Sequence, residues 1–74
     1  MNQQQRLKAM GMCIRNARKQ AGLTQQQLAE RVGFDTTYIS MLESGRRNAP
    51  FLTLSGVARG LGITLAHMLK GYKE

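Results

Sequence analysis

Residues 23–47 read LTQQQLAERVGFDTTYISMLESGRR, and this stretch decides the architecture of the chain. Its apolar residues recur at helical spacing and are interrupted by glycines at two points. Thr24 is placed to cap a helix, and Gln27 three residues later completes the spacing of a capping box. The sequence therefore predicts a short helix at residues 25–32.

The second half of the stretch predicts another short helix. Gly33 permits a sharp change of direction, and Asp35 supplies a side chain that can cap the helix that follows. Gly45 stops this helix, which we expect at residues 36–44. Two short helices joined by a tight turn form a helix-turn-helix, in which one side of the second helix packs inward and the other stays uncovered.

Three further helices are predicted, because apolar residues recur three and four positions apart on both sides of this motif. The stripes of the two longer helices are formed by Leu7, Met10, Ile14 and Ala17, and by Leu54, Val57, Ala58 and Leu61. We expect the first of these helices at about residues 4–20, ending before Gly22. Gly62 ends the other, and Thr64 caps a short last helix that reaches about Lys70.

The size and charge of the chain bound its function. The 74 residues suffice for one domain over 1–74, with frayed ends at 1–3 and 72–74. A formal net charge of +7 favours a polyanionic partner such as nucleic acid, the alternative being a merely solubilising surface. No apolar run is long enough to span a membrane, and a reducing cytoplasm suits a chain with one cysteine.

Several classes of site are not expected. Cys13 has no second thiol, and His67 has no ligand partner at helical spacing, so we expect no metal site and no cofactor. The sequence offers no paired carboxylates, no Cys-His couple and no phosphate-cradling glycine loop. We therefore expect neither an enzyme nor a binder of a small-molecule ligand.

The quoted stretch, with IRNARKQAGLTQ before it and VARGLGITLAHMLKG after it, resembles the lambda-repressor-like, Cro/C1-type helix-turn-helix domains of bacterial and phage transcription regulators. The resemblance covers about residues 10–71. It implies an all-α, compact five-helix fold whose motif at 25–44 docks in the major groove of double-stranded DNA. It also implies a homodimer on an inverted-repeat operator, acting as a small repressor or as a restriction-modification or mobile-element controller. The alternative is an antitoxin or protein-interaction module that neutralises a partner protein, with DNA binding secondary.

The resemblance assigns base reading to four positions of the second motif helix. These are Thr36, Thr37, Ser40 and Met41. Threonine can bond a base or a phosphate and can touch a thymine methyl, whereas Met41 offers only apolar contact. None of the four makes a bidentate bond to guanine, so we expect a modest direct readout, supplemented by the deformability of the DNA.

Phosphate contacts are expected on both sides of that helix. Gln25 lies at a helix N-terminus, where backbone N–H groups help to hold a phosphate, although it can also simply begin the helix. Arg46, Arg47 and Asn48 follow the motif and are assigned to phosphate, against plain solvated charge. Tyr38 has two open alternatives: its hydroxyl binds a phosphate, or its ring packs as half-buried core.

The family pairs an arginine late in the first helix with a glutamate near the end of the third, which implies a structural ion pair between Arg18 and Glu43. Without it, Glu43 would place a negative charge beside DNA. The alternative is two independent exposed charges. Arg15 and Lys19 are weaker candidates for phosphate binding, and a plain surface position is favoured for each.

The fourth helix carries the expected dimer interface. Phe51 and Leu52 are both apolar where one outward residue should be polar. Gly56 and Gly60 each cost about 1 kcal/mol in a helix interior relative to alanine, and their spacing permits close backbone approach. The alternative is that Leu52 packs on the last helix and that the glycines accommodate neighbours within the chain.

Overall fold

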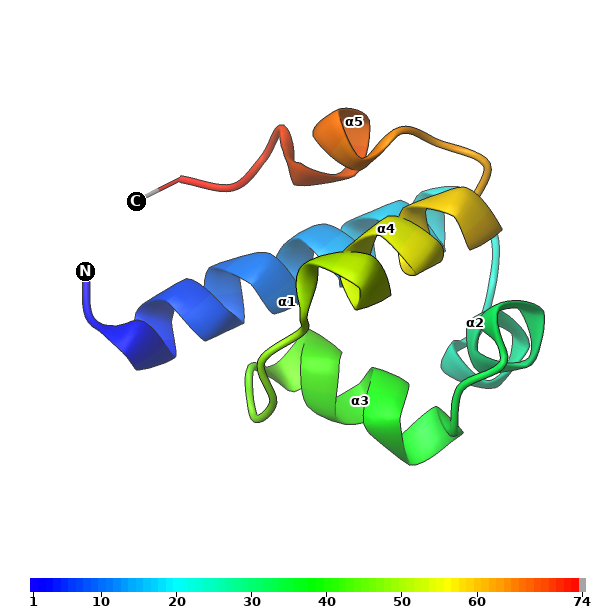
Figure 1. The fold of residues 1–74 in the computed structure, drawn as a ribbon, viewed down its shortest axis with the longest axis horizontal. Helices are drawn as coiled ribbons and strands as arrows, with labels where there is room; N and C mark the ends of the chain where they lie inside the picture. The colour runs from blue at the N-terminus through cyan, green and yellow to red at the C-terminus, as the bar shows by residue number, and fades with distance from the viewer. Residues whose placement is uncertain (74) are drawn as a thin grey trace.

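The computed structural model describes residues 1–73, which form five α-helices and no strand (Figure 1). The helices are α1 (Gln3–Gln20), α2 (Gln25–Val32), α3 (Thr36–Ser44), α4 (Phe51–Gly60) and α5 (Leu65–Leu69). The long α1 runs through the middle of the molecule and packs most extensively against α3. The expected all-α, five-helix fold is confirmed.

The predicted ends of the central helices are confirmed in detail. The Thr24 hydroxyl accepts from the Gln27 N–H, and the Gln27 side chain accepts from the Thr24 N–H, which completes the capping box. The Thr64 hydroxyl likewise accepts from the N–H of His67 at the start of α5. The glycines expected to end helices all have a left-handed backbone: Gly22, Gly33, Gly45 and Gly62. Local capping chemistry therefore sets the boundaries that place α2 against α3.

The expected cap at α3 is wrong. Asp35 occupies the N-cap position, but its side chain makes no capping hydrogen bond. The residue is exposed, so water can satisfy the first N–H groups of α3 without help from the carboxylate. The turn before it is held by the main chain, because the Phe34 N–H donates to the carbonyl of Ala29 at 2.9 Å.

Both ends of the described chain carry local hydrogen bonds. Helix α1 already begins at Gln3, because Asn2 and Gln5 form a reciprocal capping box. At the other end, Tyr72 packs against the core and its N–H donates to the carbonyl of Leu69 at 2.8 Å. Glu74, the last residue of the expected frayed tail, lies outside the described residues.

The core lies where α1, α2, α3 and α4 meet. Its largest fully buried side chains are Ile14, Leu28, Ile39, Leu42 and Val57. Glycine brings α1 and α3 into contact at the main chain, since a Cβ on Gly11 would collide with the carbonyls of Leu42 and Glu43. This packing fixes how α3 is presented to solvent. Within residues 1–73, no helix is both long and apolar enough to cross a membrane.

Candidate nucleic-acid interface

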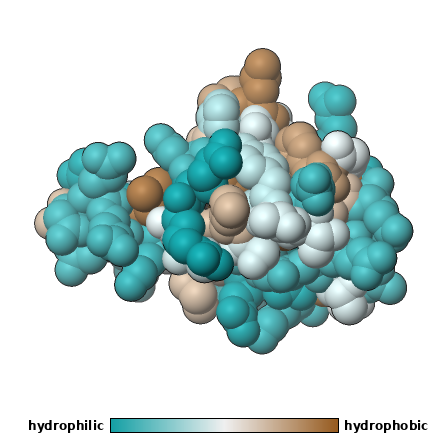
Figure 2. All heavy atoms as spheres, turned by 90° about the horizontal axis from the view of Figure 1, so that it is seen from below, coloured by the Kyte–Doolittle hydropathy of each residue, from teal (hydrophilic) through white to brown (hydrophobic). Residues whose placement is uncertain are grey.

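The outer side of α3 forms the candidate interface. Ile39 and Leu42 are completely buried on its inner side, whereas Thr36 and Thr37 are exposed and Ser40 and Met41 are half-buried. Figure 2 views the molecule from below, on the side where α3 lies, and shows a pale, weakly polar centre bordered by hydrophilic side chains. The four predicted base-reading residues therefore lie on one helix beside a polar surround.

Ser44 also belongs to this surface, although it was not among the residues predicted to bind DNA. It is exposed at the end of α3, two helical turns after Thr37. Its hydroxyl donates to the carbonyl of Met41 at 3.2 Å and accepts from the Nε of Arg46 at 3.1 Å. The seven-residue spacing from Thr37 was the signal that could have identified it.

Arg18 and Glu43 form a buried bidentate pair. The Nε of Arg18 lies 2.7 Å from Oε2 of Glu43, and its Nη2 donates to Oε1 at 3.0 Å. The two side chains are only 10% and 2% exposed. The remaining guanidinium nitrogen donates to the carbonyl of Leu23 at 2.8 Å. The alternative of two independent exposed charges is therefore wrong.

Hydrogen bonding within this pair also changes the acidity of the arginine. The bond to Glu43 raises the pKa of the Arg18 guanidinium, while burial acts in the opposite direction. Because the pair neutralises the only acidic residue of α3, the helix presents no uncompensated carboxylate. This arrangement lowers the electrostatic cost of bringing α3 near a polyanion.

Gln25 joins the same network. Its Nε2 donates to Oε1 of Glu43 at 3.1 Å, and the side chain is half-buried. This bond ties the start of α2 to the end of α3, so Gln25 does more than begin a helix. Any contact from Gln25 to phosphate must therefore come from a side chain that is already held in place.

Tyr38 packs as half-buried core, one of the two alternatives left open. Its ring meets that of Phe34 edge to face, with centroids 5.3 Å apart and an interplanar angle of 88°. The guanidinium of Arg47 lies over the Tyr38 ring, 5.3 Å from the ring centroid. Tyr38 thus orients Arg47 by a cation–π contact, whatever its hydroxyl binds.

The loop after α3 carries the other predicted phosphate contacts. Arg46, Arg47 and Asn48 are all exposed. The Arg46 N–H donates to the carbonyl of Met41 at 2.9 Å, so the loop is tied back onto α3. Two cations therefore lie directly at the C-terminal end of the candidate interface, where they complement the helix dipole.

The expected dimer interface on α4 divides into two parts. Phe51 and Leu52 are 68% and 81% exposed, so the alternative that Leu52 packs on α5 is wrong. Gly56 has open space where a Cβ would lie. For Gly60 the expected reason is wrong, because a Cβ there would collide with the side chain of Val32. Gly60 thus accommodates α2 within the same chain.

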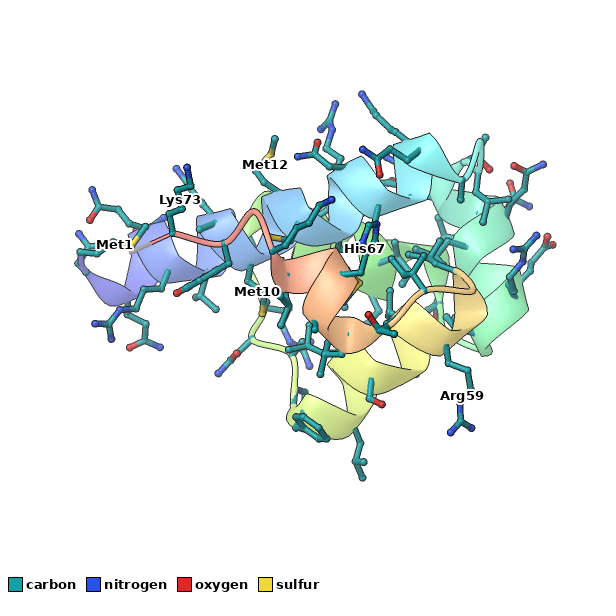
Figure 3. All side chains as sticks on the ribbon, turned by 90° about the horizontal axis from the view of Figure 1, so that it is seen from above. Met1, Met10, Met12, Arg59, His67 and Lys73 are labelled. Carbon is teal, nitrogen blue, oxygen red and sulfur yellow. The ribbon has the colours of Figure 1, made fainter. Side chains whose placement is uncertain are left out.

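Cys13 and His67 lie apart from this interface. Cys13 is buried, and burial raises the pKa of its thiol, which disfavours the reactive thiolate. His67 is exposed on α5 (Figure 3). Across residues 1–73, no group of three or more histidine, cysteine, aspartate or glutamate side chains is placed to hold a metal ion.

The sequence matches a known protein family. A family model described as Helix-turn-helix matches residues 14–68, which include α2, α3 and α4 in full. The chain belongs to this family. It is therefore a transcriptional regulator of the helix-turn-helix type and not an enzyme, and the resemblance stated from the sequence is confirmed.

Individual helix-turn-helix relatives cover most of the chain. An uncharacterised HTH-type transcriptional regulator, y4dJ of Sinorhizobium fredii, is 40% identical over 57 residues, which span 77% of this chain and 74% of the relative. The control protein C.MunI of a Mycoplasma species is 36% identical over 65 residues, covering 86% of this chain and 88% of its own.

One solved structure with a similar fold is a complex with operator DNA. The restriction-modification controller protein C.Esp1396I, described as a tetramer in complex with its natural 35 base-pair operator, superposes with a TM-score of 0.78 at 28% identity. The match covers 89% of this chain and 92% of the controller. The fold described here is thus similar to that of a controller protein seen on operator DNA.

Proposed function

We propose that this chain is a sequence-specific regulator that binds duplex DNA as a homodimer, with α3 of each protomer in the major groove of an inverted-repeat operator. The observation that carries the proposal is the uncovered outer side of α3, whose one carboxylate is neutralised from behind by Arg18. A helix of this kind can enter a groove lined by phosphates without a repulsive charge from Glu43.

Affinity would come mainly from the two ends of the motif. Arg46 and Arg47 lie at the end of α3, and Gln25 lies at the start of α2, so phosphates on both sides of the groove can be contacted. The cation–π contact with Tyr38 restricts Arg47, which lowers the entropy lost when it meets a phosphate.

Sequence discrimination would be modest. The outward residues Thr36, Thr37 and Ser40 carry single hydroxyls, and Met41 is apolar, so no side chain of this set offers the bidentate bond that reads guanine. Thymine methyl contacts and the energy of deforming the DNA would then supply a larger share of the specificity.

Dimerisation would use the outer side of α4. Phe51 and Leu52 expose hydrocarbon there, and Gly56 leaves room for a partner's main chain. The tetramer that C.Esp1396I forms on its operator supports an assembly of more than one copy on DNA. The similarity to C.MunI and C.Esp1396I favours a restriction-modification controller or a small repressor acting in the cytoplasm.

Selection of bound DNA from a random pool tests this proposal. We expect enrichment of a palindrome whose half-sites lie about one helical turn apart, because each protomer reads one half-site. The double variant Arg46→Ala/Arg47→Ala should bind that palindrome more weakly and with a shallower salt dependence. Enrichment of no sequence, or unchanged binding by the double variant, would contradict the groove-docking mechanism and favour a protein-interaction module.

A further inference from the structure

We propose that α1 carries a second contact to the DNA backbone, formed by Lys8, Arg15 and Lys19. The inference rests on the proposed DNA-binding function and extends it to a helix outside the motif and its loop. All three side chains are exposed. None of them makes a side-chain hydrogen bond or an ion pair with another of residues 1–73. They are therefore available to a partner of opposite charge.

The three cations form one column along α1. Lys8, Met12, Arg15 and Lys19 follow one another at intervals of four, three and four residues, which places them on one side of a helix. Met12 is 48% exposed, and the three cations of the column are also exposed. The column therefore faces solvent along its length and does not cover the core.

This column borders α3. Gly11 packs against the main chain of α3, and Arg18 pairs with Glu43 near its end. Around the helix, Lys8 and Arg15 alternate with these two residues at intervals of three and four. The exposed cations are therefore adjacent to the line along which α1 touches α3, on the outer edge of the candidate interface.

A second contact joins the column to the loop after α3. A Cβ on Gly45 would lie 2.9 Å from the main-chain nitrogen of Lys8 and 3.0 Å from its Cα. Arg46 and Arg47 follow Gly45 directly. Lys8 therefore lies beside the loop that carries Arg46 and Arg47.

No acidic side chain within the helix opposes this column. Helix α1 contains no aspartate or glutamate, and Glu43, which meets α1 at the junction, is already paired with Arg18. Lys8 and Arg15 are separated by about 10 Å along the helix axis. One strand of B-DNA carries a phosphate about every 3.4 Å of axis, so the two side chains can engage different phosphates.

The test compares two double variants in the full chain. Lys8→Ala/Arg15→Ala removes two cations from the column, and Lys70→Ala/Lys73→Ala removes two exposed cations elsewhere. Figure 3 shows Lys73 on the tail that crosses above α1, on the opposite side from the view of Figure 2. Both variants lower the formal net charge of +7 by the same amount. Any difference between them therefore reports position and not total charge.

Binding to a random-sequence duplex of about three helical turns is measured by fluorescence anisotropy as salt is raised. The Lys8→Ala/Arg15→Ala variant should lower the slope of log K against log salt by about 1.8 per bound protomer, at about 0.9 for each lost phosphate contact. The Lys70→Ala/Lys73→Ala variant should keep the slope of the unmodified chain. Arg15→Lys should also keep it, because the charge remains.

The outcomes separate this inference from the proposed function. Equal slopes for the two double variants, with palindrome selection by the unmodified chain intact, would overturn only the contact from α1. Failure of the unmodified chain to bind any duplex would overturn both. Circular dichroism and thermal melting of the two double variants should match the unmodified chain, since all four positions are exposed.

Discussion

The junction of α1 with α3 and the outer side of α4 differ in the residues that they bury and expose. The junction buries charged residues, and the outer side of α4 exposes large apolar ones. The junction buries an ion pair, with Arg18 10% and Glu43 2% exposed at their side chains. The outer side of α4 exposes hydrocarbon, with Phe51 and Leu52 more than two-thirds uncovered. Charged residues are ordinarily outside, and clustered large apolar residues are ordinarily covered.

The difference shows that the residues of each region suit what the region contacts. At the junction, the buried pair holds three helices together and removes a carboxylate charge from the DNA side of α3. On α4, a partner must cover the apolar side chains before their exposure is favourable. The junction is therefore complete within one chain, whereas the outer side of α4 is complete only in an assembly.

The largest effect is expected from breaking the junction at its charge. Arg18→Ala leaves Glu43 buried without a counter-charge, which should lower the free energy of unfolding by about 3–5 kcal/mol. Urea unfolding followed by circular dichroism measures this change. Arg15→Ala is the control, because that arginine is exposed one turn away. Equal stability of the two variants would show that the pair does not hold the junction.

Breaking the junction at its main-chain contact should cost somewhat less. Gly11→Ala places a Cβ against the carbonyls of Leu42 and Glu43, so α1 and α3 must move apart. We expect a loss of about 2–3 kcal/mol in the free energy of unfolding, despite the better helix propensity of alanine. Thermal unfolding would contradict the close approach if the melting temperature rose.

The outer side of α4 should respond in assembly and not in folding. Leu52→Ser removes an 81% exposed leucine, so the monomer should lose less than about 0.5 kcal/mol of stability. If this side chain is buried against a second copy, its loss costs about 1.5–3 kcal/mol of dimer free energy, or more than tenfold in the dissociation constant. Sedimentation equilibrium measures the constant. An unchanged dimer would place the interface elsewhere.

Gly56→Ala should have a smaller effect than Leu52→Ser, and it should raise the stability of the monomer. Nothing within the chain lies where its Cβ would be, so alanine should stabilise α4 by up to about 1 kcal/mol in the monomer. The same variant should weaken the dimer if a partner approaches the main chain there. A matched Gly60→Ala variant should be destabilised, because its Cβ meets Val32. Chemical unfolding at low protein concentration separates the two.

The smallest effect concerns Cys13, which is buried on α1. Burial raises the pKa of its thiol, so above the ordinary thiol pKa the unfolded chain loses a proton that the folded chain keeps. The unfolded state then binds fewer protons, and stability falls as pH rises through this region. Cys13→Ala should flatten that fall. Unfolding curves on both sides of the ordinary thiol pKa test the sign, and a steeper fall in the variant would contradict it.

Much of the scaffold could be predicted because its signals are local. The bounds of α2 and α3 follow from residues within one turn of each helix end. Thr24 and Gln27, for example, bond only to each other's main-chain N–H groups, three residues apart. Asp35 shows the limit of such reasoning. A suitable residue at a cap position bonds only if its rotamer and its exposure favour the bond, and these depend on the surroundings.

The candidate interface was predicted less completely. The outward residues of α3 follow from helical spacing, and the partner of Glu43 followed from the family resemblance. The position of Lys8 beside Gly45 had no local signal, because the two residues are 37 positions apart in sequence and meet only when α1 crosses α3. Contacts of this kind depend on the crossing of two helices, which the sequence pattern does not specify.

The helices, their ends and the spacing of the motif could all be predicted from the sequence, because hydrophobic periodicity and capping act over a few residues. Contacts between helices could be seen only in the packed fold. Gly56 and Gly60 are both glycines and lie one turn apart in α4. A Cβ on Gly56 would meet open space, whereas a Cβ on Gly60 would meet Val32. The two glycines differ because packing distances between helices are set by the whole fold, and local sequence carries no measure of them.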